Sequence, residues 1–491
     1  MKDNYTIKIH ENDNVLVSQK GLKKGESAFG IAALNDIPVG HKMALVPIRK
    51  GENIIKYGFP IGHATENIEV GQHVHTHNIK TNLKGVLDYT YEPSLLPELE
   101  VKERTFEGFK REDGKIGIRN EIWIINTVGC VNKTAERIAT KANALYDGEV
   151  DGVYTFVHPY GCSQLGDDHE HTQKILANLV HHPNAGGVLV LGLGCENNNI
   201  PEFKKVLGDH DENRVKFMNT QDMENETEHA LDLIEELVAY AKSFKREPVP
   251  VSELIVGLKC GGSDSFSGIT ANPLVGTLSD NVINCGGTSI LTEVPEMFGA
   301  ETILMNRCVS TEVFDKTVNL INDFKNYFIK HDQEVYENPS PGNKDGGIST
   351  LEDKSLGCTQ KGGTSNVVDV LNYGEMVKTK GLNLLQGPGN DIVAVTNLTA
   401  AGAHIVLFTT GRGTPLGAPV PTVKISSNST LATHKKNWID FNAGTLLEED
   451  TMEELSQKFF DYIIEVASGK KTKNEINDYR EISIFKDGVI L

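Results

Sequence analysis

The pattern of apolar and polar positions changes character near residue 106. Before that point, short apolar segments alternate with Gly, Pro and Asn turns, which predicts short β-strands. These segments are NVLV, KMALV, NIIKYG and HVHTHN. We therefore expect a small all-β domain over residues 1–87. A linker over residues 88–105 should follow, because that stretch is rich in Pro and Glu and has no periodicity.

From residue 106 onward, strand-like apolar runs alternate with amphipathic helical segments. EIWIINTVG, DGVYTFVHP and AGGVLVLGLG are strand candidates, whereas NKTAERIATKANAL and MENETEHALDLIEELVAYAKSF have the period of a helix. A second alternation begins at SELIVGLKCGG. The pattern predicts two α/β units with mostly parallel sheets, over residues 106–250 and 251–491. The polar, Gly-rich stretch from Tyr336 to Gly363 predicts a long loop.

Composition narrows the class of protein. The chain has 491 residues and a net charge of −19, which argues against nucleic acid as a partner. The N-terminus has no signal-peptide pattern, and no apolar run reaches the length of a membrane span. Seven scattered cysteines do not form a disulfide scaffold. We expect a cytoplasmic protein with reduced thiols, no membrane partner and a dimer as the default oligomer.

Histidines are concentrated in the predicted β domain. Five of the sixteen fall within residues 40–78. In a strand, side chains two residues apart share a face, so His73, His75 and His77 should point to one side. Neutral imidazoles on one face can bind Fe²⁺, Mn²⁺ or Zn²⁺, although a polar outer strand face would give the same pattern. His41 and Lys42 could supply an acid or base, or lie in an ordinary turn.

Cysteines follow several of the predicted strands. Cys130, Cys162, Cys195 and Cys260 each come just after an apolar run. Thiolates at strand ends can hold iron or an iron–sulfur cluster. The spacing is wide and lacks Cys-x-x-Cys, and free cysteines are commonly buried for packing alone. Both interpretations stay open.

Charged Gly-rich turns follow two other strands. LKCGGSDSFSG carries Lys259, Ser263, Asp264 and Ser265, and TTGRGTPLG carries Arg412. Backbone N–H groups in such turns, together with arginine, can grip a carboxylate. Neither turn has the glycine spacing of a nucleotide site, so we expect no nucleotide cofactor. TEVPE adds Glu293 and Glu296, each a metal ligand, a base or a solvated carboxylate.

The chain resembles the altronate/galactarate dehydratase family of sugar-acid dehydratases over nearly its whole length. The resemblance rests on GHKMAL, KYGFPIG, HVHTHN, TFEGFKREDGKIGIRN, HPYGC, GLGCE, CGGSDSFSGITANP, PSPGNKDGG, TTGRGTP and FNAGT. HVHTHN followed by TNL is similar to the altronate branch. The resemblance implies an N-terminal SAF-like β domain followed by two Rossmann-like α/β units.

The resemblance also implies an activity: dehydration of D-altronate to 2-dehydro-3-deoxy-D-gluconate in hexuronate catabolism, with Fe²⁺ or Mn²⁺ as cofactor. The resulting hypothesis assigns three sets of residues. Acid–base and other catalytic roles go to His41, Lys42, Lys259 and Asp264. Substrate contacts go to Ser263, Ser265, Asn343, Lys344 and Arg412. Metal ligands are His75, His77, Glu293 and Cys162.

Three alternatives remain at this point. The substrate could be galactarate or a sulfonated hydroxy acid, which relatives in the family handle. The protein could bind a sugar acid or a metal without catalysis. It could also be an iron–sulfur dehydratase that uses Cys130, Cys162 and Cys195.

Overall fold

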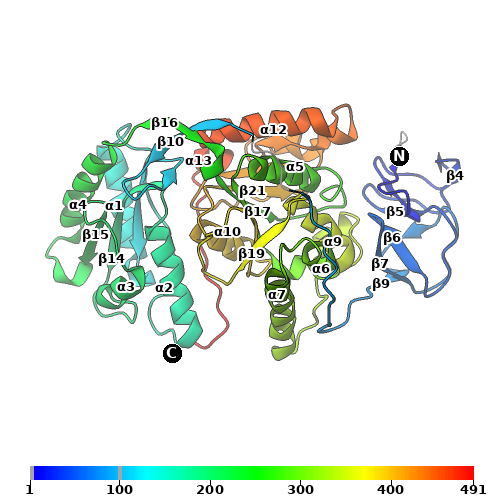
Figure 1. Ribbon diagram of the computed structural model, residues 1–491, viewed down its shortest axis with the longest axis horizontal. Coiled ribbons are helices and arrows are strands. Elements are labelled where there is room, and N and C mark those ends of the chain that lie inside the picture. Colours follow the sequence, from blue (N-terminus) through cyan, green and yellow to red (C-terminus); the bar gives the residue numbers. More distant parts are fainter. Residues whose placement is uncertain (1–4, 98–101) are drawn as a thin grey trace.

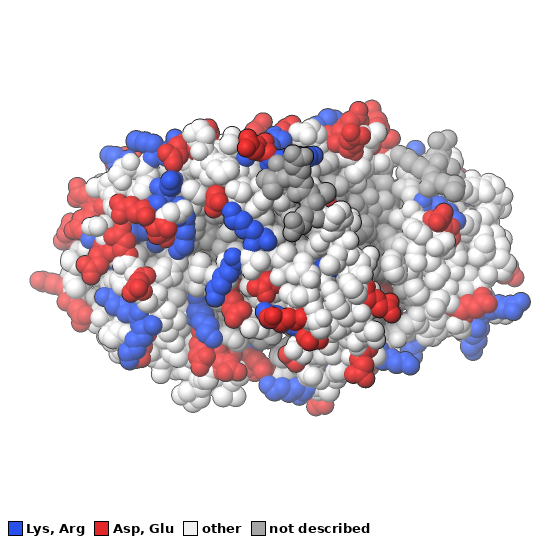
Figure 2. Space-filling model, viewed as in Figure 1, with Lys and Arg blue, Asp and Glu red and all other residues white. Residues whose placement is uncertain are grey.

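The computed structural model describes residues 5–97 and 102–491. Three bodies lie in a row along the longest axis (Figure 1). The N-terminal β domain and the first α/β unit lie at opposite ends, and the C-terminal α/β unit lies between them. Acidic and basic side chains are mixed over the face seen in Figure 2. Within the described residues, no helix is both long enough and apolar enough to cross a membrane.

The N-terminal domain consists of short antiparallel strands. One sheet has the order β1-β2-β5-β8, another has the order β6-β7-β9, and β3 pairs with β4. The strands are β1 (Thr6–Ile7), β2 (Val15–Ser18), β3 (Ser27–Ala28), β4 (Ile31–Ala32), β5 (Lys42–Ala44), β6 (Asn53–Lys56), β7 (Phe59–Ala64), β8 (His73–Val74) and β9 (Ile79–Lys80). The all-β prediction is confirmed.

The first α/β unit has a parallel sheet in the order β13-β12-β14-β15. Its strands are β12 (Glu121–Asn126), β13 (Val153–Thr155), β14 (Ala185–Gly192) and β15 (Val215–Asn219). Its helices are α1 (Asn132–Leu145), α2 (Gly166–Val180), α3 (Ile200–Leu207) and α4 (Glu226–Ala241). A small antiparallel sheet of β10 (Thr105–Lys110), β11 (Ile116–Gly117) and β16 (Arg246–Pro250) joins the two ends of the unit.

Side chains alternate between two cores along β12. Ile122 and Ile124 pack with α1 and α4, whereas Trp123 and Ile125 pack on the other face. That second face continues into the C-terminal unit through residues such as Phe408. A parallel strand buried on both faces reads as a continuous apolar run, as EIWII does. The two α/β units therefore share one core.

The C-terminal unit has a parallel sheet in the order β19-β20-β18-β17-β21-β22-β23. The strands are β17 (Ile255–Cys260), β18 (Thr288–Leu291), β19 (Val367–Leu371), β20 (Gly381–Leu385), β21 (Ile405–Thr410), β22 (Thr422–Ser426) and β23 (Phe441–Asn442). The helices are α5 (Ala271–Asn284), α6 (Glu301–Met305), α7 (Thr311–Lys330), α8 (Pro341–Asp345), α9 (Leu351–Cys358), α10 (Asp391–Ala400), α11 (Ser429–His434), α12 (Met452–Ala467) and α13 (Lys473–Ile476).

The predicted long loop over residues 336–363 is wrong. The stretch contains α8 and α9, and every residue of α9 is buried although its sequence is LEDKSLGC. A helix with polar residues all round carries no amphipathic signal. Its charged side chains are buried because they pair with charges from other elements. The helix is therefore visible only when those partners are known.

The chain between the β domain and the first α/β unit packs against the C-terminal unit. Tyr89 donates a hydrogen bond to Glu301 at 2.6 Å, and Ser94 N donates to Asn306 O at 2.7 Å. The described part of the predicted linker has neither helix nor strand before β10. Residues 98–101 of that linker lie outside the described residues.

Candidate active site

Histidine side chains gather where the β domain meets the C-terminal unit. His41 Nδ1 lies 3.0 Å from His73 Nε2, and the ring centroids of His41 and His75 are 4.4 Å apart. The ring of His77 lies 5.2 Å from that of His73. The strand β8 ends at Val74, and a turn follows, so the expected continuous strand through HVHTHN is wrong. The turn nevertheless brings the rings together.

The electrostatics of this histidine group favour neutral rings. Burial lowers the pKa of His41, of His73 to about 4 and of His75 to about 3, and the charge of Lys42 adds to the effect. A neutral imidazole keeps one nitrogen lone pair. His75 Nδ1 is buried without a hydrogen-bond partner among the described residues. An unpaired ring nitrogen among neutral imidazoles is a ligand of the type that Fe²⁺, Mn²⁺ and Zn²⁺ accept, although within the described residues no three histidine nitrogens lie within 4.8 Å of one another.

Buried ion pairs fix the β domain to α9. Lys42 of β5 and Lys56 of β6 contact the two oxygens of Asp353, each at 2.8 Å. Lys42 also donates to Gly347 O at 2.8 Å. Burial lowers the pKa of Lys42 to about 8. Burial would raise the pKa of Asp353, but the charges of both lysines hold it well below its usual range. Lys42, a predicted catalytic residue, thus has its ammonium enclosed by the domain contact.

A second buried group of charges occupies the carboxyl ends of β17 and β18. Lys259 donates to Glu293 and pairs with Asp391 at 2.8 Å. Burial would lower the pKa of Lys259, but Glu293 and Asp391 raise it, so it remains a cation. Glu293 has φ 70, a left-handed conformation that is uncommon outside glycine. Such strain persists where the surroundings enforce it, often at functional sites.

Thiols lie beside this group of charges. Glu296 Oε2 accepts hydrogen bonds from Cys260 at 2.9 Å and from Cys358 at 3.2 Å, and the two sulfur atoms are 3.5 Å apart. In the described chain, this is the one group of His, Cys, Asp or Glu side chains whose ligand atoms all lie within 4.8 Å. Lys354 contacts Glu296 at 2.8 Å. The contact between the two sulfur atoms lowers the pKa of Cys260 to about 6 and raises that of Cys358, and the nearby ammonium groups oppose a bound cation.

A pocket of about 510 Å³ opens between the β domain and the C-terminal unit. Lys20 and Val39 line one wall, and Asp264, Arg412 and Asn428 line the other. Arg412 is exposed, and Asn428 and Ser429 begin α11. The volume lies within the usual range for a small-molecule site. The pocket combines a cation with several hydrogen-bonding side chains.

Asp264 is buried in the wall of this pocket with its oxygens occupied. Oδ1 accepts from Ser267 N at 2.9 Å and from Ser427 Oγ at 2.8 Å, and Oδ2 accepts from Asn428 at 3.1 Å. Burial raises the pKa of Asp264, and these hydrogen bonds oppose the rise. An added Cβ at Gly411 would lie 2.2 Å from Asp264 Cγ, so the turn before Arg412 requires glycine. Asp264 joins its own turn to the loop of Ser427 and Asn428.

The remaining predicted substrate residues lie beside the pocket. Asn343 caps α8 and donates to Ser263 O at 2.8 Å, and Ser265 Oγ accepts from Lys56 at 3.2 Å. Lys344 is half-buried in α8. Ser263 and Ser265 line a cavity of about 10 Å³ that also reaches Lys354 and Cys358. That volume holds about one water molecule.

The structure does not bring all the predicted metal ligands together. His75 and His77 lie in the β domain, whereas Glu293 pairs with lysines at the carboxyl end of β18. Cys162 follows β13 in the first α/β unit, at the far end of the molecule (Figure 1). Sequence reasoning missed the buried partners Lys56, Asp353, Lys354, Cys358 and Lys361. Lys56 lies in a predicted strand, the other four lie in the stretch predicted as a loop, and no local pattern marked any of them as buried.

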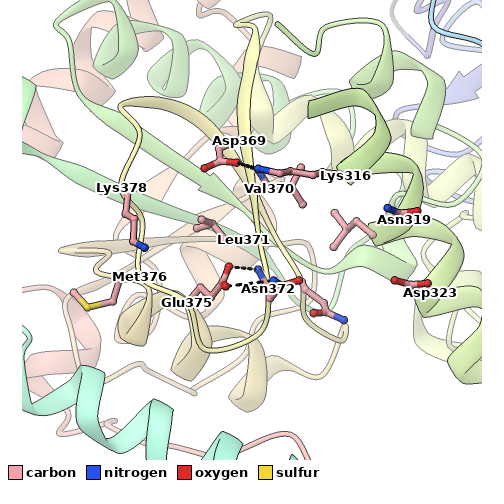
Figure 3. A pocket seen from close by; sticks show the side chains of 12 residues that line it. Lys316, Asn319, Asp323, Asp369, Val370, Leu371, Asn372, Glu375, Met376 and Lys378 are labelled. Carbon is pink, nitrogen blue, oxygen red and sulfur yellow. Dashed lines mark hydrogen bonds and ion pairs between the residues drawn. The ribbon is translucent and has the colours of Figure 1, made fainter. Parts of the chain in front are cut away.

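Another pocket, of about 460 Å³, lies between α7 and the segment after β19 (Figure 3). Lys316 points toward Asp369 at 3.2 Å, and Glu375 accepts from Asn372 N at 2.8 Å. Asp323 adds a further carboxylate. Because acidic groups outnumber free cations there, the pocket suits a carboxylate ligand poorly.

Comparison with known proteins places this site in a family. Family models match the "Altronate/galactarate dehydratase SAF domain" at residues 4–82, the "D-galactarate dehydratase/Altronate hydrolase, second domain" at 108–242 and the "D-galactarate/Altronate dehydratase, C-terminal" at 251–490. Altronate dehydratase of Bacillus subtilis is 57% identical, and that of Escherichia coli is 54% identical, each over 99% of both chains. Galactarate dehydratase (L-threo-forming) of Escherichia coli is 36% identical over 95% of this chain and 93% of its own. The chain therefore belongs to the altronate/galactarate dehydratase family, whose SAF domain it carries at its N-terminus.

Proposed function

We propose that the protein removes water from D-altronate to form 2-dehydro-3-deoxy-D-gluconate. Identities of 57% and 54% to altronate dehydratases, against 36% to a galactarate dehydratase, support the altronate branch. The observation that carries the proposal is the pocket between the SAF domain and the C-terminal unit, whose lining includes Arg412 and the amide and hydroxyl side chains of residues 428–430. A six-carbon hydroxy acid presents the same mixture of one carboxylate and several hydroxyls.

Substrate orientation follows from the charges in the pocket. Arg412 and Lys20 provide the cations for the carboxylate. Asn428, Ser429 and Thr430 can pair with the hydroxyls. Asp264 joins its own turn to the loop of Ser427 and Asn428, which suits a positioning residue, because both of its oxygens already accept hydrogen bonds. This role differs from the catalytic role that the sequence suggested.

Dehydration requires a base for the proton on C2 and an acid for the hydroxyl that leaves C3. His41 and His73 share a hydrogen bond of 3.0 Å, so one nitrogen carries a proton while the other accepts it. Val39 and Gly346 line the pocket, and His41 Nε2 lies 3.2 Å from Asp345 O. The histidine group and the pocket therefore lie next to each other along the same contact. We assign proton transfer to His41 and His73.

His75 would hold the divalent metal through its unpaired Nδ1, with His77 as a neighbouring ligand. When bound, Fe²⁺ or Mn²⁺ would stabilise negative charge that develops on the substrate carboxylate. Lys42 and Lys56 hold the SAF domain against the C-terminal unit, so the histidines keep their position beside the pocket. Lys259 and Glu293 form a buried ion pair at the carboxyl ends of β17 and β18. Neither member of that pair is placed as a free base.

The remaining features belong to the same proposal. Both α/β units are inferred to be Rossmann-like, with function at the carboxyl ends of parallel strands. The substrate is a small molecule, and a cytoplasmic location and a homodimer remain predictions.

The test is turnover by chelator-stripped protein with Fe²⁺, Mn²⁺ or Zn²⁺ added back without oxygen. D-altronate and galactarate are compared side by side, and the 2-keto-3-deoxy acid is measured. Product from altronate alone, with Fe²⁺ or Mn²⁺, supports the proposal. Faster turnover of galactarate would place the protein in the galactarate branch of the family. Tight binding of both acids without product would indicate a non-catalytic binding protein.

A further inference from the structure

Three cysteines outside the site described above share one edge of the first α/β sheet. Cys130 follows β12, Cys162 follows β13 and Cys195 follows β14. These strands are parallel neighbours in the order β13-β12-β14, so their carboxyl ends meet at one edge. All three thiols are free and exposed, whereas Cys260, Cys285, Cys308 and Cys358 are buried. An exposed thiol is accessible to metal ions and oxidants, so three together call for an explanation.

The loops that carry these cysteines are bonded to one another. Gly129 N donates to Tyr160 O at 2.9 Å, which joins the loops of Cys130 and Cys162. Asn198 N donates to Gly161 O at 2.9 Å, and Ser163 N donates to Asn197 Oδ1 at 2.8 Å. These bonds join the residues flanking Cys162 to the loop of Cys195. The three thiols therefore project from one connected set of turns.

The residues on both sides of Cys162 have positive φ. Gly161 has φ +99, and an added Cβ would lie 2.0 Å from Thr127 O. Ser163 has φ 58, a left-handed conformation in a residue other than glycine. Strain of this kind costs about 1–3 kcal/mol and persists where a functional geometry is enforced. The chain thus holds Cys162 in a fixed orientation.

Each cysteine also precedes the start of a helix. α1 begins at Asn132, α2 at Gly166 and α3 at Ile200, so three helix N-termini lie at the edge where the thiols are exposed. The partial positive charge of a helix N-terminus stabilises thiolates and bound anionic groups. Three such ends together compensate the negative charge of a thiolate-ligated centre.

The spacing of the thiols decides which centre they suit. Sulfur ligands of one tetrahedral ion lie about 4 Å apart, because Zn–S bonds are about 2.3 Å. Within the described residues, the exposed thiols do not form a group whose ligand atoms all lie within 4.8 Å, so at least one of their sulfur–sulfur distances exceeds that limit. A cluster binds each thiolate to a different iron atom and needs that wider spacing. We propose that Cys130, Cys162 and Cys195 bind a [4Fe–4S] cluster.

Three protein ligands leave the fourth iron of the cluster without a side chain. That iron can accept an oxygen ligand such as a carboxylate or a hydroxyl. Apolar side chains border the edge: Leu165 precedes α2 and is 48% exposed, and Ile490, which pairs with Gln164, is 62% exposed. The site lies in a different body from the histidine group (Figure 1). The inference therefore adds a second iron centre, independent of the substrate proposed above.

The experiment transfers a preformed cluster to the full-length protein without oxygen. The donor is a [4Fe–4S] complex with four small thiolate ligands. Each of three protein thiols forms an Fe–S bond and gives its proton to a departing small thiolate, so no electron is transferred. After gel filtration, iron, acid-labile sulfide and the brown charge-transfer absorption are measured. We expect about four iron atoms and four sulfides per chain.

Three variants test the ligands: Cys130→Ser, Cys162→Ser and Cys195→Ser. Each should retain at most about one-tenth of the iron and sulfide that the wild-type protein retains. Because these side chains are exposed, the variants should fold, which circular dichroism checks. Cys285→Ser is the matched control and should load fully. The proposal is overturned if the wild-type protein retains no cluster, or iron without sulfide. It is equally overturned if only Cys260→Ser and Cys358→Ser lose the cluster. Because no sugar acid is present, failure here is separate from failure of altronate turnover.

Discussion

Lys42 in the SAF domain and Asp353 in α9 form a hydrogen-bonded ion pair of 2.8 Å, with neither side chain exposed. The second oxygen of Asp353 contacts Lys56, so one carboxylate neutralises two buried ammonium groups. Burying a charge is costly unless it is paired, and here the pairs cross a domain contact. Asp353 therefore anchors the SAF domain to the C-terminal unit, together with Glu352, which accepts hydrogen bonds from Thr81 and from Asn82 N.

Replacing Asp353 should unseat the SAF domain. Asp353→Asn leaves Lys42 and Lys56 buried without a countercharge, which we expect to cost about 3–5 kcal/mol of unfolding free energy. Urea unfolding and limited proteolysis near residue 85 measure the loss. Asp36→Asn is the control in the same domain, because its contact with Lys23 is exposed and should leave stability unchanged. Equal behaviour of the two variants would show that the buried pairs contribute little.

Arg412 should govern substrate affinity. Arg412→Ala removes the exposed guanidinium of the pocket, so kcat/KM for altronate should fall about tenfold to a hundredfold, mostly through KM. Arg412→Lys should recover part of the loss, since the positive charge remains but the planar guanidinium with its paired N–H donors is lost. Arg137→Ala is the control, because that arginine pairs with Glu226 in the first α/β unit. An unchanged KM in Arg412→Ala would place the carboxylate elsewhere.

Much of the fold was predictable because apolar periodicity reports burial directly. The helix predicted from NKTAERIATKANAL coincides with α1, and the apolar strand AGGVLVLG coincides with β14. The same signal failed for α9, whose charged side chains are buried against Lys42, Lys56 and Glu296. Hydropathy records a residue type, whereas burial of a charge depends on a partner that is distant in sequence.

Prediction of the candidate site succeeded and failed for the same reason. Arg412 and Asp264 were identified from Gly-rich turns after strands, which is a local signal, and both line the pocket. The histidines were identified from their clustering, but the bend after Val74 was not expected, because HVHTHN alternates like a strand. Cys162 was grouped with the histidines although nothing local links them, and the structure places it with Cys130 and Cys195 at another sheet edge. A single sequence gives the least support to a prediction that residues from different domains meet in one site.

The unpaired nitrogen of His75 should control metal binding. His75→Ala should weaken Mn²⁺ binding to chelator-treated protein at least about tenfold, because His75 Nδ1 is buried with no partner among the described residues. Isothermal titration calorimetry measures the affinity without turnover. His63→Ala is the control, since His63 is a histidine of the same domain whose Nδ1 already contacts Asn82 at 2.8 Å. If both variants bind Mn²⁺ like the wild type, the histidine group is not the metal site.

Buried neutral histidines should make the protein sensitive to acid. Burial lowers the pKa of His404 to about 4 and that of His158 to about 4. In each ring, Nδ1 accepts a backbone N–H, from Ile255 at 3.1 Å and from Tyr160 at 3.2 Å respectively, so a second proton would break that bond. The unfolded chain, with histidine pKa near about 6.5, binds more protons between about pH 4 and 6.5. Stability should therefore fall as the pH drops through that window.

Each of these two histidines should contribute up to about 3 kcal/mol to the loss, since one pKa unit corresponds to about 1.4 kcal/mol. Urea unfolding at pH 7.0, 5.5 and 4.5 measures the slope, and His404→Gln should reduce it, because glutamine does not titrate. His210→Gln serves as the control, because His210 is exposed and contacts Gly208 O in its own loop. A slope that His404→Gln leaves unchanged would mean that His404 is already protonated, or free to turn outward, in the folded protein. The buried ring of His404 would then not be the source of the acid sensitivity.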